Sequence, residues 1–137
     1  MKKVMLDSSV WISLFVRDMH KEQADQIFKK LMKRNVIILV PMIIYAEVMN
    51  NIIKLNQPSF EKEVKMIFNN TDNIMLLDYD YKFWHEHVLE CARHAKLRAL
   101  DLLIITSALL FKVDELYTFD IKMETEYNKI IKSQSYA

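Results

Sequence analysis

Short, unbroken apolar runs recur along the chain, and longer amphipathic stretches separate them. Continuous apolar runs, in contrast to runs that alternate with polar residues, are typical of strands buried on both faces of a sheet. The run VIILV is β-branched and ends at Pro41, which indicates a strand followed directly by the first residue of a helix. We predict four strands, at 4–7, 36–40, 73–77 and 114–119.

The segments between the runs have the spacing of helices. In 18–34, for example, Ala24, Ile27 and Leu31 fall on one side of a helix. The turn NQPS offers Ser59 as an N-cap for a helix over 60–69. Helices are therefore predicted near Ser9, over 18–34, 42–55 and 60–69, from Asp78 or Asp80 to about Lys96, over 100–111, and in the tail after Glu124.

Strands and helices alternate along the chain, and this order favours an α/β fold. Continuous apolar strands joined through helices predict a mostly parallel central sheet with helices on both faces, that is, a three-layer α/β/α sandwich. Crossovers between parallel strands are expected to be right-handed. The length of 137 residues fits a single domain, so we expect one domain over 1–137.

Composition narrows the function classes. Glycine is absent, which excludes a P-loop and a dinucleotide-binding fingerprint. The formal net charge of +1 excludes a polybasic binder, so any nucleic-acid contact must be a local patch. The single cysteine, Cys91, favours a reducing compartment, and the first apolar run is broken at Asp7, unlike a signal peptide. Because the longest apolar stretches are too short to span a bilayer, we expect a cytoplasmic protein without a membrane partner.

Four acidic residues stand where chemistry is expected in such a fold. Asp7 and Asp120 each end a predicted strand, Asp101 opens the apolar helix 100–111, and Glu47 lies within the apolar context IIYAEVM. Strand carboxyl ends and the helices that follow them share one edge of a doubly wound sheet, where ligands bind. The four carboxylates are therefore predicted to meet in one crevice.

Carboxylates at such distances repel one another unless a cation is present. Oxygen ligands and few histidines favour Mg²⁺ or Mn²⁺ over zinc, and a carboxylate-held divalent cation suits hydrolysis of a phosphodiester. Asp7, Glu47, Asp101 and Asp120 are the predicted catalytic metal ligands.

Simpler interpretations exist for each acid. Asp7 and Asp101 could cap helices, Asp120 could be a turn residue, and Glu47 could face solvent. A separate set, His87, Cys91 and His94, shares a helix face and could bind zinc, although no fourth ligand is evident.

The motifs LDSSVWISLF, YAEV, LDLLIITSAL and YTFD, in this order and spacing, resemble those of the PIN domain family of ribonucleases, especially small VapC-like toxins. The resemblance covers essentially the whole chain and implies a Mg²⁺/Mn²⁺-dependent endoribonuclease with an α/β/α sandwich. It matches the four acids named above to the acidic quartet of the family. It also implies that Ser9 and Thr118 orient the ligands.

The resemblance implies partners as well, namely an RNA substrate, a second copy of the chain in a homodimer, and an antitoxin protein. Arg93, Lys96 and Arg98 precede Asp101 and could guide RNA into the crevice, or they could be solvated surface. The basic run KKLMKR (29–34) is explained by a helix C-terminus, with RNA contact as the other interpretation. Alternative functions are an RNA-processing nuclease without an antitoxin and a non-enzymatic PIN-like scaffold.

Overall fold

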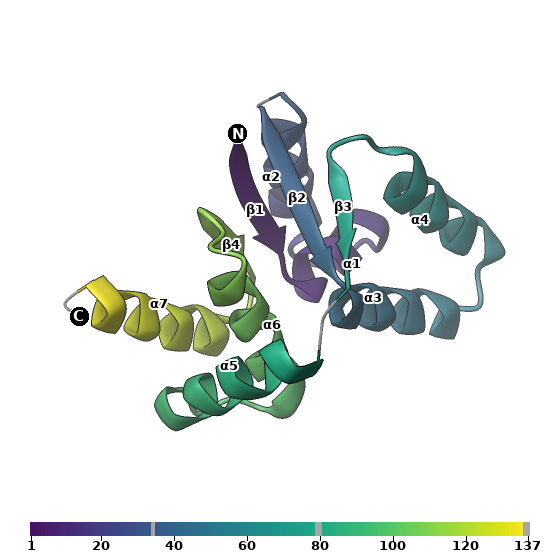
Figure 1. Cartoon of the computed structure of the whole chain (residues 1–137). Coiled ribbons are helices and arrows are strands. Elements are labelled where there is room, and N and C mark those ends of the chain that lie inside the picture. The colour runs from purple at the N-terminus through teal and green to yellow at the C-terminus, as the bar shows by residue number, and fades with distance from the viewer. Residues whose placement is uncertain (34, 79–80, 136–137) are drawn as a thin grey trace.

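The computed structural model describes residues 1–33, 35–78 and 81–135 (Figure 1). Helices and strands alternate along the chain as the apolar pattern predicts. Their bounds are β1 (Lys2–Leu6), α1 (Ser8–Phe15), α2 (Lys21–Met32), β2 (Val36–Pro41), α3 (Met42–Lys54), α4 (Pro58–Asn70), β3 (Ile74–Leu77), α5 (Tyr81–His94), α6 (Ala99–Leu110), β4 (Glu115–Tyr117) and α7 (Ile121–Ser135).

The strands form one parallel sheet in the order β3-β2-β1-β4, which confirms the predicted α/β fold class. β1 is central, with Lys2 opposite Val36 of β2 and Leu6 opposite Tyr117 of β4. Its side chains Val4, Met5 and Leu6 are fully buried, as a strand covered on both faces must be.

The order of the strands creates a switch point next to β1. The chain moves outward from β1 to β2 and β3, and then returns to the other side of β1 for β4. Right-handed crossovers place helices that follow such a reversal on the opposite face of the sheet. Figure 1 accordingly shows α5, α6 and α7 grouped apart from α1, α3 and α4. Ligands of open α/β sheets bind at this point, beyond the carboxyl ends of the strands.

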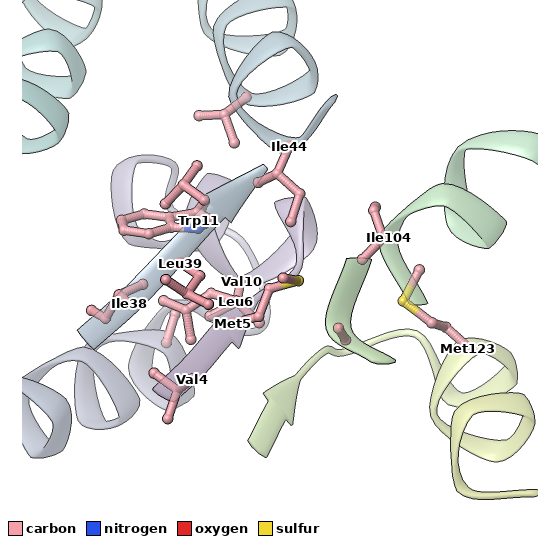
Figure 2. Close-up of a cluster of buried hydrophobic side chains, with 14 of the residues drawn as sticks. Val4, Met5, Leu6, Val10, Trp11, Ile38, Leu39, Ile44, Ile104 and Met123 are labelled. Carbon is pink, nitrogen blue, oxygen red and sulfur yellow. The ribbon is translucent and has the colours of Figure 1, made fainter. Parts of the chain in front are cut away.

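Trp11 of α1 anchors the core on one face of the sheet. Its ring is fully buried and packs against Phe68 of α4 at 4.6 Å and Phe28 of α2 at 6.0 Å between centroids. Figure 2 shows Trp11 beside the β1 and β2 side chains, with Ile104 and Met123 on the side of α6 and α7. In the described part of the chain, no helix combines the length and apolarity needed to cross a membrane.

Some predicted boundaries differ from the structure. The helix predicted over 18–34 begins only at Lys21, after a turn in which Asp18 accepts from the His20 N–H. Ser59 is not an N-cap, because Pro58 occupies the first turn and Gln57 is the cap residue. Proline suits that position, since its fixed φ matches the helix and it has no N–H to leave unpaired. Of the two caps predicted for α5, Asp80 lies outside the described residues.

The absence of glycine leaves a trace in the backbone. Asn56 and Lys112 have φ values of 53° and 52°, the left-handed conformation that usually belongs to glycine after a helix. Asn56 follows the cap of α3 and Lys112 follows the cap of α6. Asparagine tolerates this conformation better than lysine, so the strain is expected mainly at Lys112.

Candidate active site

Asp7 lies at the switch point, between the end of β1 and the start of α1. Its side chain is only 4% exposed, and it caps α1 by accepting a hydrogen bond from the Ser8 N–H at 2.7 Å. The other carboxylate oxygen, Oδ2, accepts from Ser9 Oγ at 2.9 Å and from Thr118 Oγ1 at 2.8 Å. The capping interpretation is therefore correct for Asp7, but it accounts for only one of the two carboxylate oxygens.

Glu47 approaches Asp7 from α3. Ser8 Oγ lies 3.3 Å from Asp7 Oδ1 and 3.3 Å from Glu47 Oε2, so this hydroxyl connects the two carboxylates. Burial, followed by the negative charge of Asp7, raises the pKa of Glu47. Glu47 is half-buried, and its Oε1 is buried without a hydrogen-bond partner among the described residues, so this oxygen is directed away from solvent.

Asp101 joins the same group from the first turn of α6. The cap of that helix is Arg98, so the alternative in which Asp101 serves as the N-cap is wrong. Burial raises the pKa of Asp101, and the charges of Asp7 and Asp120 raise it further. Its side chain is 19% exposed, and the Arg98 Nε lies 3.9 Å from its Oδ2.

Asp120 ends the segment that follows β4 and begins α7. Its Oδ1 accepts from the N–H groups of Lys122 at 3.0 Å and Met123 at 3.2 Å, as an N-cap carboxylate does. Its own N–H donates to Thr118 Oγ1 at 3.0 Å. Thr118 therefore connects the backbone of Asp120 to the carboxylate of Asp7.

The fold thus brings the four predicted acids to one place and orients Asp7 through Ser9 and Thr118. Ser8 is the polar residue that sequence reasoning missed. The doublet after Asp7 was the available signal, but the rotation of α1 decides that the first serine reaches Glu47.

The donor chemistry of this group fits a hard divalent cation. The ligands of the cation would be carboxylate oxygens. The raised pKa values of Glu47 and Asp101 mean that their charged forms are disfavoured without a cation, and the buried Glu47 Oε1 has no hydrogen-bond partner among the described residues. The carboxylates are close enough to shift one another's pKa values, but they are not arranged as metal ligands. Among the described residues, no three His, Cys, Asp or Glu side chains form a metal-binding group.

The side chains of the predicted zinc alternative, on α5, are not arranged for zinc. Cys91 is 6% exposed, and burial raises the pKa of its thiol, which disfavours the thiolate that zinc requires. His94 Nε2 instead lies 3.2 Å from Glu90 Oε1 on the exposed face of α5. A zinc site at His87, Cys91 and His94 is not supported in the part of the chain that the structure describes.

The predicted basic contacts separate into two kinds. Arg98 is close enough to the acids to lower the pKa of Glu47 and Asp101, although its own side chain is 89% exposed. Arg93 instead pairs with Glu90 on α5, and Lys96 is exposed in the connection to α6. Of these three predicted residues, only Arg98 is thus placed next to the candidate site; Lys122, which was not predicted, also lowers the pKa of Asp101.

Several solved structures of bacterial proteins share this fold. VapC20 of Mycobacterium tuberculosis, a sarcin–ricin loop cleaving toxin, aligns over 89% of this chain and 93% of its own, with a TM-score of 0.72 and 10% identity. VapBC2 from Rickettsia felis, bound to a promoter DNA fragment, aligns over 90% and 92%, with a TM-score of 0.68 and 19% identity. VapBC-1 from nontypeable Haemophilus influenzae aligns over 95% and 93%, with a TM-score of 0.64 and 20% identity.

At these identities the similarity demonstrates a shared fold. None of the curated protein sequences matches the chain. The family model described as the PIN domain, however, matches residues 4–125, which include β2, β3, β4, most of β1 and every residue of the acidic group. The chain therefore belongs to the PIN domain family.

Proposed function

We propose that the chain is a Mg²⁺- or Mn²⁺-dependent endoribonuclease and the toxin of a toxin–antitoxin pair. The observation that carries the proposal is the group of Asp7, Glu47, Asp101 and Asp120 at the switch point of a PIN fold. Burial, and after it the charges of neighbouring acids, raises the pKa of Glu47 and of Asp101. Such a concentration of negative charge destabilises the folded state, and clusters of this kind are typical of functional sites.

The residues divide the work by their surroundings. Asp7 is fixed by hydrogen bonds to both oxygens, so it would hold its position when substrate and cation arrive. Glu47 and Asp101 have fewer partners and would complete the binding of the cation. Asp120 would supply the oxygen that its capping role leaves open, because Lys122 and Met123 both donate to Oδ1.

These four acids would hold the divalent cation. A bound Mg²⁺ or Mn²⁺ supplies an electrophile for the phosphate and makes water more acidic. Arg98, extended into solvent beside Asp101, would attract the RNA backbone toward the acids and offset part of their repulsion of phosphate.

An antitoxin partner is supported by the nature of the structural relatives. VapBC2 and VapBC-1 are named as complexes, and FitAcB from Neisseria gonorrhoeae aligns over 91% of this chain with a TM-score of 0.66 and 13% identity. We propose a homodimer on the same family grounds. Light scattering of the purified chain tests the dimer. Co-expression with the product of an adjacent small reading frame tests the antitoxin, which should bind and suppress cleavage.

Cleavage of a mixed RNA panel tests the activity. The wild type and the variants Asp7→Asn and Asp101→Asn would be compared on tRNAs and rRNA fragments with Mg²⁺, Mn²⁺ or EDTA. We expect cleavage that needs the metal and falls by about a hundredfold or more in both variants.

Asp72→Asn is the matched control. Asp72 is an exposed aspartate just before β3, at the opposite edge of the sheet, and its substitution should leave cleavage unchanged. Cleavage that survives the loss of Asp7 and Asp101 would contradict the proposed site. If no RNA of the panel is cleaved, calorimetry with Mn²⁺ separates the remaining explanations: metal binding would indicate a nuclease whose substrate is not in the panel, and loss of metal binding would favour the scaffold alternative.

A further inference from the structure

A groove lies beside the acidic group, between α2 and the segment that ends β4. It has a volume of about 360 Å³ and is lined by Gln23, Gln26, Ile27, Lys30, Tyr117 and Phe119. The α2 members are spaced as one stripe of a helix, and the two aromatic residues are spaced as one face of an extended strand. Two regular elements therefore build this groove, and no long loop contributes to it.

The groove is joined to the candidate active site through Phe119. Its backbone N–H donates to Ser9 Oγ at 3.2 Å, and that hydroxyl donates to Asp7 at 2.9 Å. Phe119 is also the residue between Thr118 and Asp120. The groove and the acidic group are therefore connected through adjacent residues of one short segment.

The lining has the chemistry of a nucleobase site. Tyr117 and Phe119 provide aromatic surface, on which bases stack. Gln23 and Gln26 provide amides, which can donate and accept hydrogen bonds as the edge of a base requires; Gln23 Oε1 lies 3.2 Å from His20 Nδ1, so Gln23 offers mainly its NH2 group. His20 stacks on Phe119 with centroids 4.5 Å apart and an interplanar angle of 16°, which steadies the ring.

Lys30 connects the groove to the basic run on α2. It lines the groove and belongs, with Lys29 and Lys33, to the segment KKLMKR, whose Arg34 lies outside the described residues. Lys30 also lowers the pKa of Glu115, which places the positive charge of Lys30 near the start of β4, beside the Glu115 carboxylate. The groove therefore has an acidic neighbour at one end and a positive charge at the other.

We propose that this groove is a nucleobase subsite for single-stranded RNA that extends from the acidic group along α2 toward Lys30. The inference rests on the proposed nuclease function and adds to it a path for the substrate. A base would lie against the aromatic wall, the glutamine amides would contact its edge, and Lys30 would contact a flanking phosphate. The volume is at the lower end for small-ligand sites and suits a single base better than a helix of a protein partner.

Binding of labelled RNA homopolymers (rA, rC, rG and rU) in EDTA tests the subsite. We expect Lys30→Ala to weaken all four complexes and to lower the slope of log affinity against log salt by about 0.7, the loss of one single-strand phosphate contact. Lys29→Ala is the matched control, because Lys29 is the adjacent exposed lysine and does not line the groove. It should leave both the affinity and the slope as in the wild type.

The double variant Gln23→Ala/Gln26→Ala separates a base contact from a general charge effect. We expect the preference among the four homopolymers to fall by about fivefold or more, the loss of roughly one net hydrogen bond to a base edge, with the salt slope unchanged. Melting temperatures of all variants would be measured to exclude unfolding as the cause.

The outcomes distinguish this inference from the proposed function. If cleavage requires Asp7 and a metal but the groove variants bind and cleave RNA like the wild type, the subsite is overturned and the nuclease stands. Loss of binding to a co-expressed antitoxin in these variants, with RNA affinity intact, would assign the groove to a protein and also overturn the subsite. If no RNA is cleaved but base preference depends on the glutamines, the subsite stands without the nuclease.

Discussion

Thr118 shows how much one side chain does in the acidic group. Its hydroxyl donates to Asp7 Oδ2 and accepts from the Asp120 N–H, so it links the ends of β1 and β4 beside the charges. A hydroxyl can do both at once, and no apolar side chain of the same shape can replace it.

We predict that Thr118→Val destabilises the fold by about 1–2 kcal/mol, because the Asp120 N–H and one Asp7 oxygen each lose a partner. Cleavage should fall by roughly tenfold through misplacement of Asp7. Thermal melting and kcat measure the two effects. Thr118→Ser keeps the hydroxyl and should restore both, and equal behaviour of the valine and serine variants would argue against a hydrogen-bonding role.

Substitution of Glu47, unlike that of Thr118, is expected to stabilise the fold. Its pKa is raised by burial and by Asp7, so its negative charge disfavours the metal-free fold. We predict that Glu47→Gln stabilises the chain in EDTA by a few tenths to about 1 kcal/mol, the range for relief of a like-charge contact.

The same variant should respond less to metal. Under the proposed function Mn²⁺ would bind the folded site and not the unfolded chain, so it should stabilise the wild type by about 2.7 kcal/mol at a hundredfold excess over Kd and raise its melting temperature. The Gln variant should lose most of that rise. A lower melting temperature of Glu47→Gln in EDTA would mean that the charged carboxylate is already stabilised by its neighbours.

At the scale of elements, helix ends are where this glycine-free chain is most constrained. Lys112 holds a left-handed backbone after α6, with its N–H bonded to the Leu109 carbonyl at 3.2 Å, and the next N–H, of Val113, is bonded to the Ala108 carbonyl at 3.1 Å. These bonds close the helix at the expense of a strained φ.

We predict that Lys112→Gly stabilises the fold by about 1 kcal/mol, because glycine adopts this φ without strain. Asn56→Gly should gain only a few tenths of a kcal/mol, since asparagine tolerates the same conformation. Chemical denaturation measures both. Lys112→Ala controls for loss of the lysine side chain and should give no gain, and a gain equal to that of glycine would remove backbone strain as the explanation.

At the scale of the whole molecule, the sheet joins segments from the two ends of the chain. β1 pairs with β4, and the Lys2 ammonium bonds to the Glu115 carboxylate across that pair, while the Tyr117 hydroxyl donates to the same carboxylate within β4. These contacts hold the pKa of Glu115 below its ordinary value. The acidic group depends on this pairing, because Asp7 follows β1 and Thr118 and Asp120 follow β4.

A lowered pKa gives stability that is present above the unfolded value and lost as pH falls through the folded one. For Glu115 the loss therefore begins below about pH 4.5, the ordinary glutamate value. We predict that Lys2→Met lowers stability at neutral pH by at most about 1 kcal/mol, because the pair is partly exposed, and that the difference from the wild type vanishes in acid. Urea titrations at several pH values measure it, and a difference that persists in acid would indicate lost packing instead.

The sequence alone determined the local features. Continuous apolar runs located the strands to within a residue or two, and their lack of alternation indicated a parallel sheet, because burial on both faces leaves no polar positions. The four acids could be assigned to one edge of the sheet, since in parallel strands the carboxyl ends coincide. Ser59 failed as a cap because Pro58 competes locally for the start of α4, a balance that residue preferences alone did not resolve.

Only the tertiary structure decided which residues meet. The return of the chain to the far side of β1 sets Asp120 and Asp101 close enough to affect each other, and the rotation of α1 brings Ser8 to Glu47. The groove between α2 and β4 likewise exists only because two elements distant in sequence lie side by side. Such contacts depend on strand order and helix rotation, which long-range packing sets and local periodicity does not encode.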